Sequence, residues 1–154
     1  MRKILALFIV TFSIFIPSIS HALIEVDITR GNLNPLPISV SPLFSDKASS
    51  ELLKKELKIG DIGSEIAKVV ENNLKQTGLF NPLDKKSFLQ KPDIAHLKPR
   101  FEDWNLIKSQ ALVTGKVSYE DQKLRVEFRL WDVLAGREML ALAFTTVPNN
   151  WRRV

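Results

Sequence analysis

The fold class of this chain is set by residues 111–146, which read ALVTGKVSYEDQKLRVEFRLWDVLAGREMLALAFTT. Three strand-like segments, 111–119, 124–131 and 138–146, are separated by short turns. In the middle segment every second residue is apolar and the intervening residues are mostly charged, so one face is expected to be buried and the other wet. Short links require antiparallel neighbours. Gly115, inside the first segment, indicates either a bulge or a close backbone approach.

The clearest helical pattern precedes these strands and covers residues 62–77. Its apolar positions follow the spacing i, i+4, i+7, i+8 and i+12, which is one helix face; they are Ile62, Ile66, Val69, Val70 and Leu74. Asp61 can cap the start through its carboxylate, and Gly78 suits the position after the end because glycine accepts positive φ. Glu71 and Lys75 have the spacing of an i,i+4 ion pair.

The remaining elements are shorter. We expect a first core strand at 37–44, a narrow amphipathic helix at 51–57, a second main helix at 101–109, and a loop from 85 to 99. The two main helices, 62–77 and 101–109, would pack on one face of a mixed β-sheet. The predicted class is therefore α+β with two layers, and a flexible arm at the N-terminus.

The N-terminus has the order of a secretory signal peptide over residues 1–22. Arg2 and Lys3 precede an apolar run, 4–16, and the segment ends in Ser20-His21-Ala22. We expect cleavage between Ala22 and Leu23. The alternative is an uncleaved anchor, but a membrane span needs about 20 apolar residues. The chain has no cysteine, which excludes disulfides, thiolate metal sites and a lipid-modified cysteine after the cleavage site.

A β-capable arm, residues 23–34, would follow cleavage. Apolar residues alternate at Ile24, Val26 and Ile28, and prolines stiffen the chain after it. The arm is either an edge strand of the domain or a segment that pairs with a partner's sheet edge. The candidate partner-binding residues are Leu23, Ile24, Glu25, Val26, Asp27, Ile28, Thr29, Arg30, Gly31 and Asn32.

The residues favour binding over catalysis. The formal net charge is +5, yet no dense basic cluster with aromatics indicates nucleic acid. His96 is a single histidine in the predicted surface loop, with no partner at metal-ligand spacing. Asp27, Asp61 and Asp132 are isolated carboxylates, and no nucleotide or nucleophile motif occurs. We therefore expect no enzyme activity, no metal and no cofactor.

The chain resembles the amino-terminal part of the TolB family over almost all of the predicted mature sequence. The Gly-Leu-Phe-Asn-Pro and Val-Thr-Gly-Lys-Val segments are fairly specific in combination. The residues that carry the resemblance are Leu23–Gly31, Pro35–Val40, Asp61, Ile62, Leu74, Gly78–Leu83, Trp104, Ala111–Val117 and Arg129–Val133.

The resemblance implies a periplasmic adaptor between TolA of the inner membrane and the lipoprotein Pal of the outer membrane, supporting outer-membrane integrity and invagination at division. It implies that the arm, Leu23–Asn32, binds the C-terminal domain of TolA. The family continues into a β-propeller that carries most of the Pal site, and residues 148–154 look like a helix cut short. We expect 35–154 to be a truncated domain of this type, with Pal binding in doubt and no membrane span after cleavage. The alternatives are another periplasmic interaction domain, such as a lipoprotein-like activator of a cell-wall enzyme, or a non-functional remnant.

Overall fold

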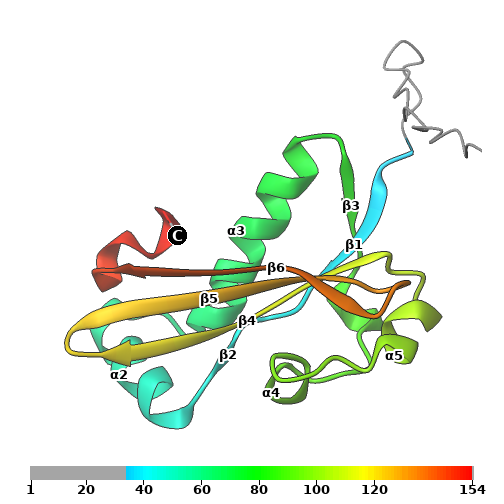
Figure 1. The fold of residues 1–154 in the computed structure, drawn as a ribbon. Helices are drawn as coiled ribbons and strands as arrows, with labels where there is room; N and C mark the ends of the chain where they lie inside the picture. The colour runs from blue at the N-terminus through cyan, green and yellow to red at the C-terminus, as the bar shows by residue number, and fades with distance from the viewer. Residues whose placement is uncertain (1–33, 154) are drawn as a thin grey trace, which may run out of the picture. The chain divides into compact units, whose positions relative to one another are not determined.

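A computed structural model describes residues 34–153, and this part of the chain forms one mixed sheet (Figure 1). The strand order is β3-β1-β4-β5-β6, and β2 also pairs with β4. The strands are β1 (Leu36–Val40), β2 (Phe44–Ser45), β3 (Phe80–Pro82), β4 (Ala111–Glu120), β5 (Lys123–Asp132) and β6 (Arg137–Thr146). β1 runs parallel to β3 and β4, whereas β4, β5 and β6 are antiparallel neighbours. The predicted α+β class and the three antiparallel strands are confirmed.

The helices differ in part from the prediction. They are α2 (Lys47–Leu57), α3 (Ile62–Gln76), α4 (Pro92–Ala95), α5 (Phe101–Leu106) and the 3₁₀ helices η2 (Lys85–Ser87) and η3 (Pro148–Arg153). The expectation that 85–99 is all loop was wrong. Asp84 caps η2 through the backbone N–H of Lys86, and Pro92 starts α4, where its missing N–H costs little. The C-terminal residues form 3₁₀ turns.

The ends of α3 follow the sequence prediction. The Asp61 carboxylate accepts hydrogen bonds from the backbone N–H groups of Gly63 and Ser64, at 3.0 and 3.3 Å. Gly78 has the expected positive φ of 72°. The predicted pair of Glu71 with Lys75 was wrong, because the Glu71 carboxylate instead lies 3.3 Å from the Lys85 ammonium. That contact ties α3 to the segment after β3.

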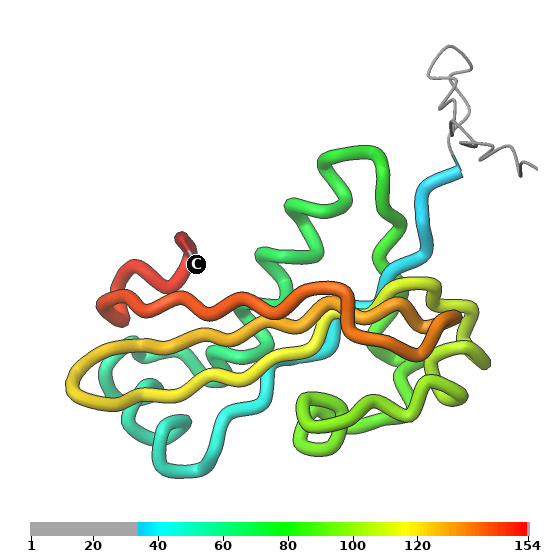
Figure 2. The backbone as a smooth tube through the Cα atoms, viewed as in Figure 1, coloured from blue at the N-terminus to red at the C-terminus, as the bar shows by residue number. Residues whose placement is uncertain are grey.

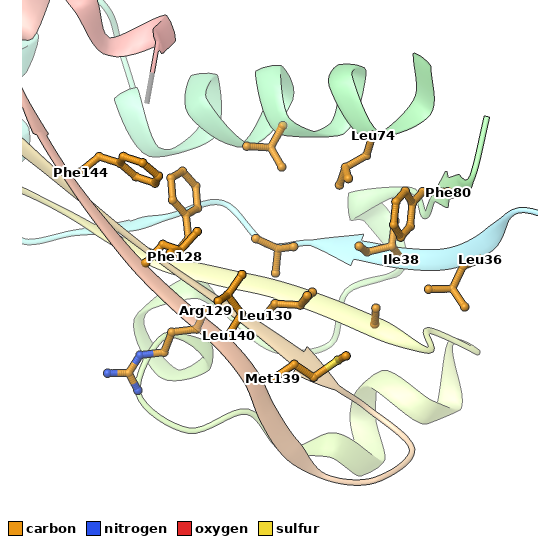
Figure 3. Close-up of a pocket in the computed structure, with 14 residues that line it drawn as sticks. Leu36, Ile38, Leu74, Phe80, Phe128, Arg129, Leu130, Met139, Leu140 and Phe144 are labelled. Carbon is orange, nitrogen blue, oxygen red and sulfur yellow. The ribbon is translucent and has the colours of Figure 1, made fainter. Parts of the chain in front are cut away.

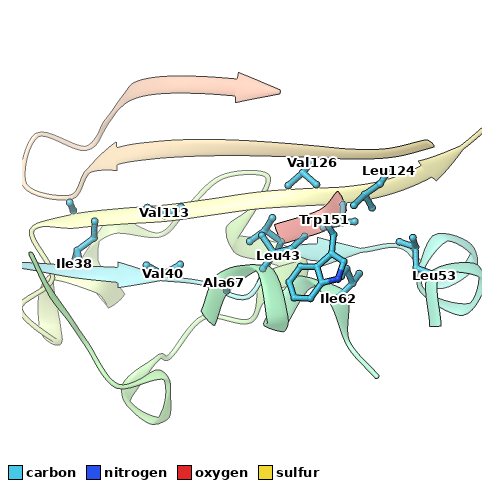
Figure 4. Close-up of a cluster of buried hydrophobic side chains, with 13 residues drawn as sticks. Ile38, Val40, Leu43, Leu53, Ile62, Ala67, Val113, Leu124, Val126 and Trp151 are labelled. Carbon is cyan, nitrogen blue, oxygen red and sulfur yellow. The ribbon is translucent and has the colours of Figure 1, made fainter. Parts of the chain in front are cut away.

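Two hydrophobic clusters lie on opposite faces of the sheet because neighbouring residues of β4 alternate between them. Ala111 and Val113 belong to the first cluster with α2 and α3, and Leu112 belongs to the second with α5. The expectation that the 62–77 and 101–109 helices share one face is therefore corrected: α3 shares its face with α2. Figure 4 shows the first cluster, in which Trp151 of η3 fills the space beside α3.

A hydrogen-bonded chain joins α2 to the sheet through Asp46 and Ser49. The Asp46 carboxylate accepts from the Ser49 backbone N–H at 2.9 Å and from its hydroxyl at 3.0 Å. The Ser49 hydroxyl oxygen in turn accepts from the Tyr119 backbone N–H at 3.1 Å, although the two residues are 70 positions apart. This cap explains why α2 starts four residues before the predicted position 51.

Replacing Asp46 with alanine should lower the free energy of unfolding by about 1 kcal/mol at neutral pH, the usual value of an N-cap. The Ser49 backbone N–H, helped by its hydroxyl and by Lys116, holds the pKa of Asp46 below its ordinary value. A carboxylate whose pKa is lower in the folded state than in the unfolded state stabilises the fold at pH values above its unfolded-state pKa. This stabilisation is lost as the pH falls through the folded-state pKa. Urea unfolding between neutral and acidic pH should therefore show the difference between the two proteins shrinking. Asp46→Asn keeps an acceptor and should change stability less at neutral pH; an equal loss in both variants would contradict the prediction.

Candidate partner-binding surface

An apolar groove of about 520 Å³ lies between α3 and the sheet, on the face of the first hydrophobic cluster (Figure 3). Val70 and Leu74 of α3 form one wall, and strands β1, β3, β4, β5 and β6 supply the rest. The lining residues are Leu36, Ile38, Val70, Leu74, Phe80, Ala111, Val113, Phe128, Arg129, Leu130, Met139, Leu140, Leu142 and Phe144.

Strand β6 forms the open side of this groove, since it is the last strand of the sheet (Figure 2). The register places Leu140 opposite Leu130, and Leu142 opposite Phe128, on the groove side. Their side chains remain 48% and 45% exposed, and Phe144 remains 40% exposed. α3 covers the part of this face over β1 and β4, so the apolar residues of β6 are left without a covering element in the described part of the chain.

The groove is lined by apolar side chains and has almost no hydrogen-bonding groups. Arg129 is its single charged lining residue, and in Figure 3 its guanidinium points away from the apolar side chains. That guanidinium lies 3.7 Å from the carboxylate of Glu138. Without convergent polar groups a cleft cannot position a substrate for acid–base chemistry. The groove suits an occupant that presents apolar side chains.

The isolated ionisable residues have structural roles. His96 was expected at the surface of a loop, but it ends α4 half-buried, stacked on Phe44 with ring centroids 4.2 Å apart. Its Nδ1 lies 3.0 Å from the Pro92 carbonyl oxygen. Asp61 caps α3, and the Asp132 carboxylate accepts from the Ala135 backbone N–H in the turn after β5. Among residues 34–153 no three potential ligands come together as a metal site.

The residues predicted from sequence to bind a partner, Leu23–Asn32, lie outside the described residues, as do the predicted signal peptide and its cleavage point at Ala22. None of the helices in the described part of the chain has the length and apolar character needed to span a membrane. The groove was not predicted from the sequence. Its signal was the apolar alternation at Leu140, Leu142 and Phe144, which is also the pattern of a strand with an ordinary buried face.

Comparison with known proteins gives the chain its relatives. A family model described as the TolB amino-terminal domain matches residues 24–139. The Tol-Pal system protein TolB of Pelagibacter ubique (strain HTCC1062) is 75% identical over 141 residues, which are 92% of this chain and 32% of the relative. The chain thus spans about a third of the length of that relative.

Two solved structures share the fold. TolB from Acinetobacter baumannii superposes with a TM-score of 0.55 at 18% identity, covering 77% of this chain and 25% of that one. The LpoB C-terminal domain from Escherichia coli superposes with a TM-score of 0.53 at 11% identity, covering 76% of this chain and 86% of that one. At these identities the likeness concerns architecture alone. The family-model match and the Pelagibacter relative are the decisive findings, and the chain belongs to the TolB amino-terminal domain family.

Proposed function

We propose that this chain is a periplasmic adaptor of the Tol-Pal system, and not an enzyme. Residues Leu23–Asn32 of its arm bind the C-terminal domain of TolA by adding a strand to a sheet edge of that domain. Through this contact, and together with the part of the TolB family that lies beyond the region matched here, the protein links TolA at the inner membrane to Pal at the outer membrane, and so supports outer-membrane integrity and invagination during cell division. Residues 1–22 direct export and are removed before Leu23.

The observation that carries the proposal is the extent of the family match, which begins at residue 24 and so includes nearly all of the arm. The arm is therefore part of what the family shares, not an unrelated leader. Its alternation of Ile24, Val26 and Ile28 supplies an extended segment with apolar side chains on one side. In strand addition, main-chain hydrogen bonds give the affinity and alternate side chains give the specificity.

The direct test is binding of the exported chain, starting at Leu23, to the periplasmic C-terminal domain of TolA, measured by calorimetry. A version lacking Leu23–Asn32 is measured beside it. We expect binding by the first and none by the second. Equal binding by both would move the site to the body of the domain, and binding by neither would remove TolA as a partner of this segment.

Proline substitutions in the arm should weaken TolA binding without unfolding the domain. Val26→Pro and Ile28→Pro each remove a backbone donor and fix φ, and one lost hydrogen bond of about 1–1.5 kcal/mol corresponds to about a tenfold weaker Kd. Asn34→Pro is the matched control, since it makes the same change outside the proposed contact. Circular dichroism should be unchanged in all three variants. Wild-type affinity in both arm variants would refute strand addition by the arm.

We assign the contact with Pal to the part of the TolB family beyond the region that this chain matches. The chain corresponds to about a third of its Pelagibacter relative, and we expect most of the Pal site to lie in the propeller of the longer family members. A pull-down with purified Pal should therefore give no complex with Leu23–Val154 alone. A complex would instead place a Pal contact on this domain.

A further inference from the structure

Strand β6 leaves a long backbone edge open beside the apolar groove. Within residues 34–153 its one strand partner is β5. Every residue from Arg137 to Thr145 is exposed, and Thr146, at the far end, is half-buried. The outward N–H and C=O groups of a ten-residue edge form a template for pairing with another strand.

From Leu140 onward the edge lacks the features that usually prevent such pairing. Natural edge strands are commonly interrupted by proline, lysine, a bulge in the outer strand or an inward-pointing charge. Arg137 and Glu138 are the two charged residues of β6, and both lie at its start. From Met139 to Phe144 every residue of the strand is apolar. The pairing with β5 passes from Leu130↔Leu140 to Trp131↔Glu138, which leaves Met139 as an extra residue and makes a bulge at the start of this stretch, whereas the pairing from Leu140 to Thr146 is regular.

The sequence of β6 is complementary to itself in one antiparallel register. Residues that face each other across antiparallel strands lie on the same side of the sheet, so a two-fold axis at Leu142 places Leu142 opposite its own copy. The same register places Leu140 opposite Phe144. A register centred on Ala141 would instead place Phe144 opposite the bulged start of the strand, and one centred on Ala143 would place Leu140 opposite Thr146. Only the Leu142 register pairs the three large apolar side chains among themselves.

We propose that the β6 edge and the adjoining groove bind a second copy of this chain, with the two β6 strands antiparallel about an axis at Leu142. The two sheets become continuous, and the apolar residues of both β6 strands form one cluster along the joined groove faces. This contact is isologous, so it closes as a dimer. It goes beyond the proposed adaptor function and does not depend on it, because the arm is not part of the contact.

A second copy fits both features of this surface, whereas an apolar molecule or a helix fits one. An acyl chain or a small apolar molecule would fill the groove but leave the β6 backbone groups unpaired. A helix laid in the groove would have no backbone donors to offer the edge, since its own are used internally. An identical strand supplies the backbone partners and the complementary side chains together.

The first test is the mass of the exported chain, Leu23–Val154, by sedimentation equilibrium over a range of concentrations. One strand edge is a small contact beside the ~1,600 Å² of a standard complex, so we expect a weak dimer that dissociates on dilution. Leu142→Lys places two ammonium groups opposite each other at the axis and should abolish the dimer. Ala143→Lys is the matched control, because residue 143 faces the other side of the sheet, opposite Glu127, and should leave the dimer intact. A monomer at all concentrations in the unmodified chain would overturn the proposal.

The second test fixes the register. The chain contains no cysteine, so Leu142→Cys introduces a single thiol that can bridge only to another copy. Directly opposed strand residues have Cα atoms about 4.5–5.5 Å apart, within the range that a disulfide requires. Under mild oxidation Leu142→Cys should give a covalent dimer, and Ala143→Cys, displaced from the axis, should give none. Equal crosslinking of both variants would mean random collision, and crosslinking of Ala143→Cys alone would mean another register; either result overturns the proposed contact.

Discussion

Replacing Trp104 with alanine is expected to lower the free energy of unfolding by about 3–5 kcal/mol, the usual cost of removing a buried tryptophan. Trp104 is 1% exposed and is the largest fully buried side chain of the described residues. It packs edge-on against Phe88 with ring centroids 5.0 Å apart. The cluster to which it belongs has only five buried residues, Trp104 included, so few neighbours can move to fill the space. Since domains are stable by about 5–15 kcal/mol, the variant would be close to unfolding.

The Trp104 side chain also completes a polar contact. Its indole N–H donates to the Gln90 side-chain oxygen at 2.9 Å, and the Arg100 backbone N–H donates to the same oxygen at 3.0 Å. Trp104→Phe keeps most of the ring and leaves Gln90 with its Arg100 contact, so we expect a loss of about 1–2 kcal/mol for the hydrogen bond and the smaller ring. Urea unfolding followed by far-ultraviolet circular dichroism measures both variants. A loss below about 1 kcal/mol for Trp104→Ala would mean that this face of the sheet contributes little to stability.

Replacing Gly115 with alanine is expected to cost about 3 kcal/mol or more, because the new methyl group would meet backbone, not a flexible side chain. An ideal Cβ at this position lies 2.2 Å from the Glu127 carbonyl oxygen and 3.1 Å from Leu43 Cγ. β4 and β5 are the central antiparallel pair, so relieving the contact requires the two strands to separate locally. The measurement is again the free energy of unfolding in urea.

Gly60→Ala is the matched control for this substitution. A Cβ at Gly60 would meet nothing within 4 Å, and reducing the freedom of the unfolded chain should leave the variant neutral or stabilised by up to about 1 kcal/mol. The contrast separates the close approach at Gly115 from any general effect of replacing glycine. Similar small effects in both variants would show that β4 and β5 can part without cost.

Local patterns in the sequence were sufficient for the elements whose residues alternate with a clear period. The alternation from Leu124 to Leu130 predicted β5, and the apolar face of 62–77 predicted α3 with its cap at Asp61 and its end at Gly78. These signals work because a strand or helix with one buried face must repeat its apolar residues at the period of that element. The family followed from combined short segments, of which Gly78–Leu83 is one.

Contacts between distant residues determined the rest. Periodicity shows that a helix buries one face but not which side of the sheet receives it, and so α5 was placed beside α3 although Trp104 packs on the opposite side. From the sequence, Gly115 indicated either a bulge or a close backbone approach. The carbonyl oxygen of Glu127 on the neighbouring strand lies 2.2 Å from where a Cβ would be, so the close approach is the correct interpretation. The open side of the groove at Leu142 depends on β6 being the last strand of the sheet. The residues of β6 read as an ordinary half-buried strand, because a local pattern carries no information about whether a further strand or helix will cover it.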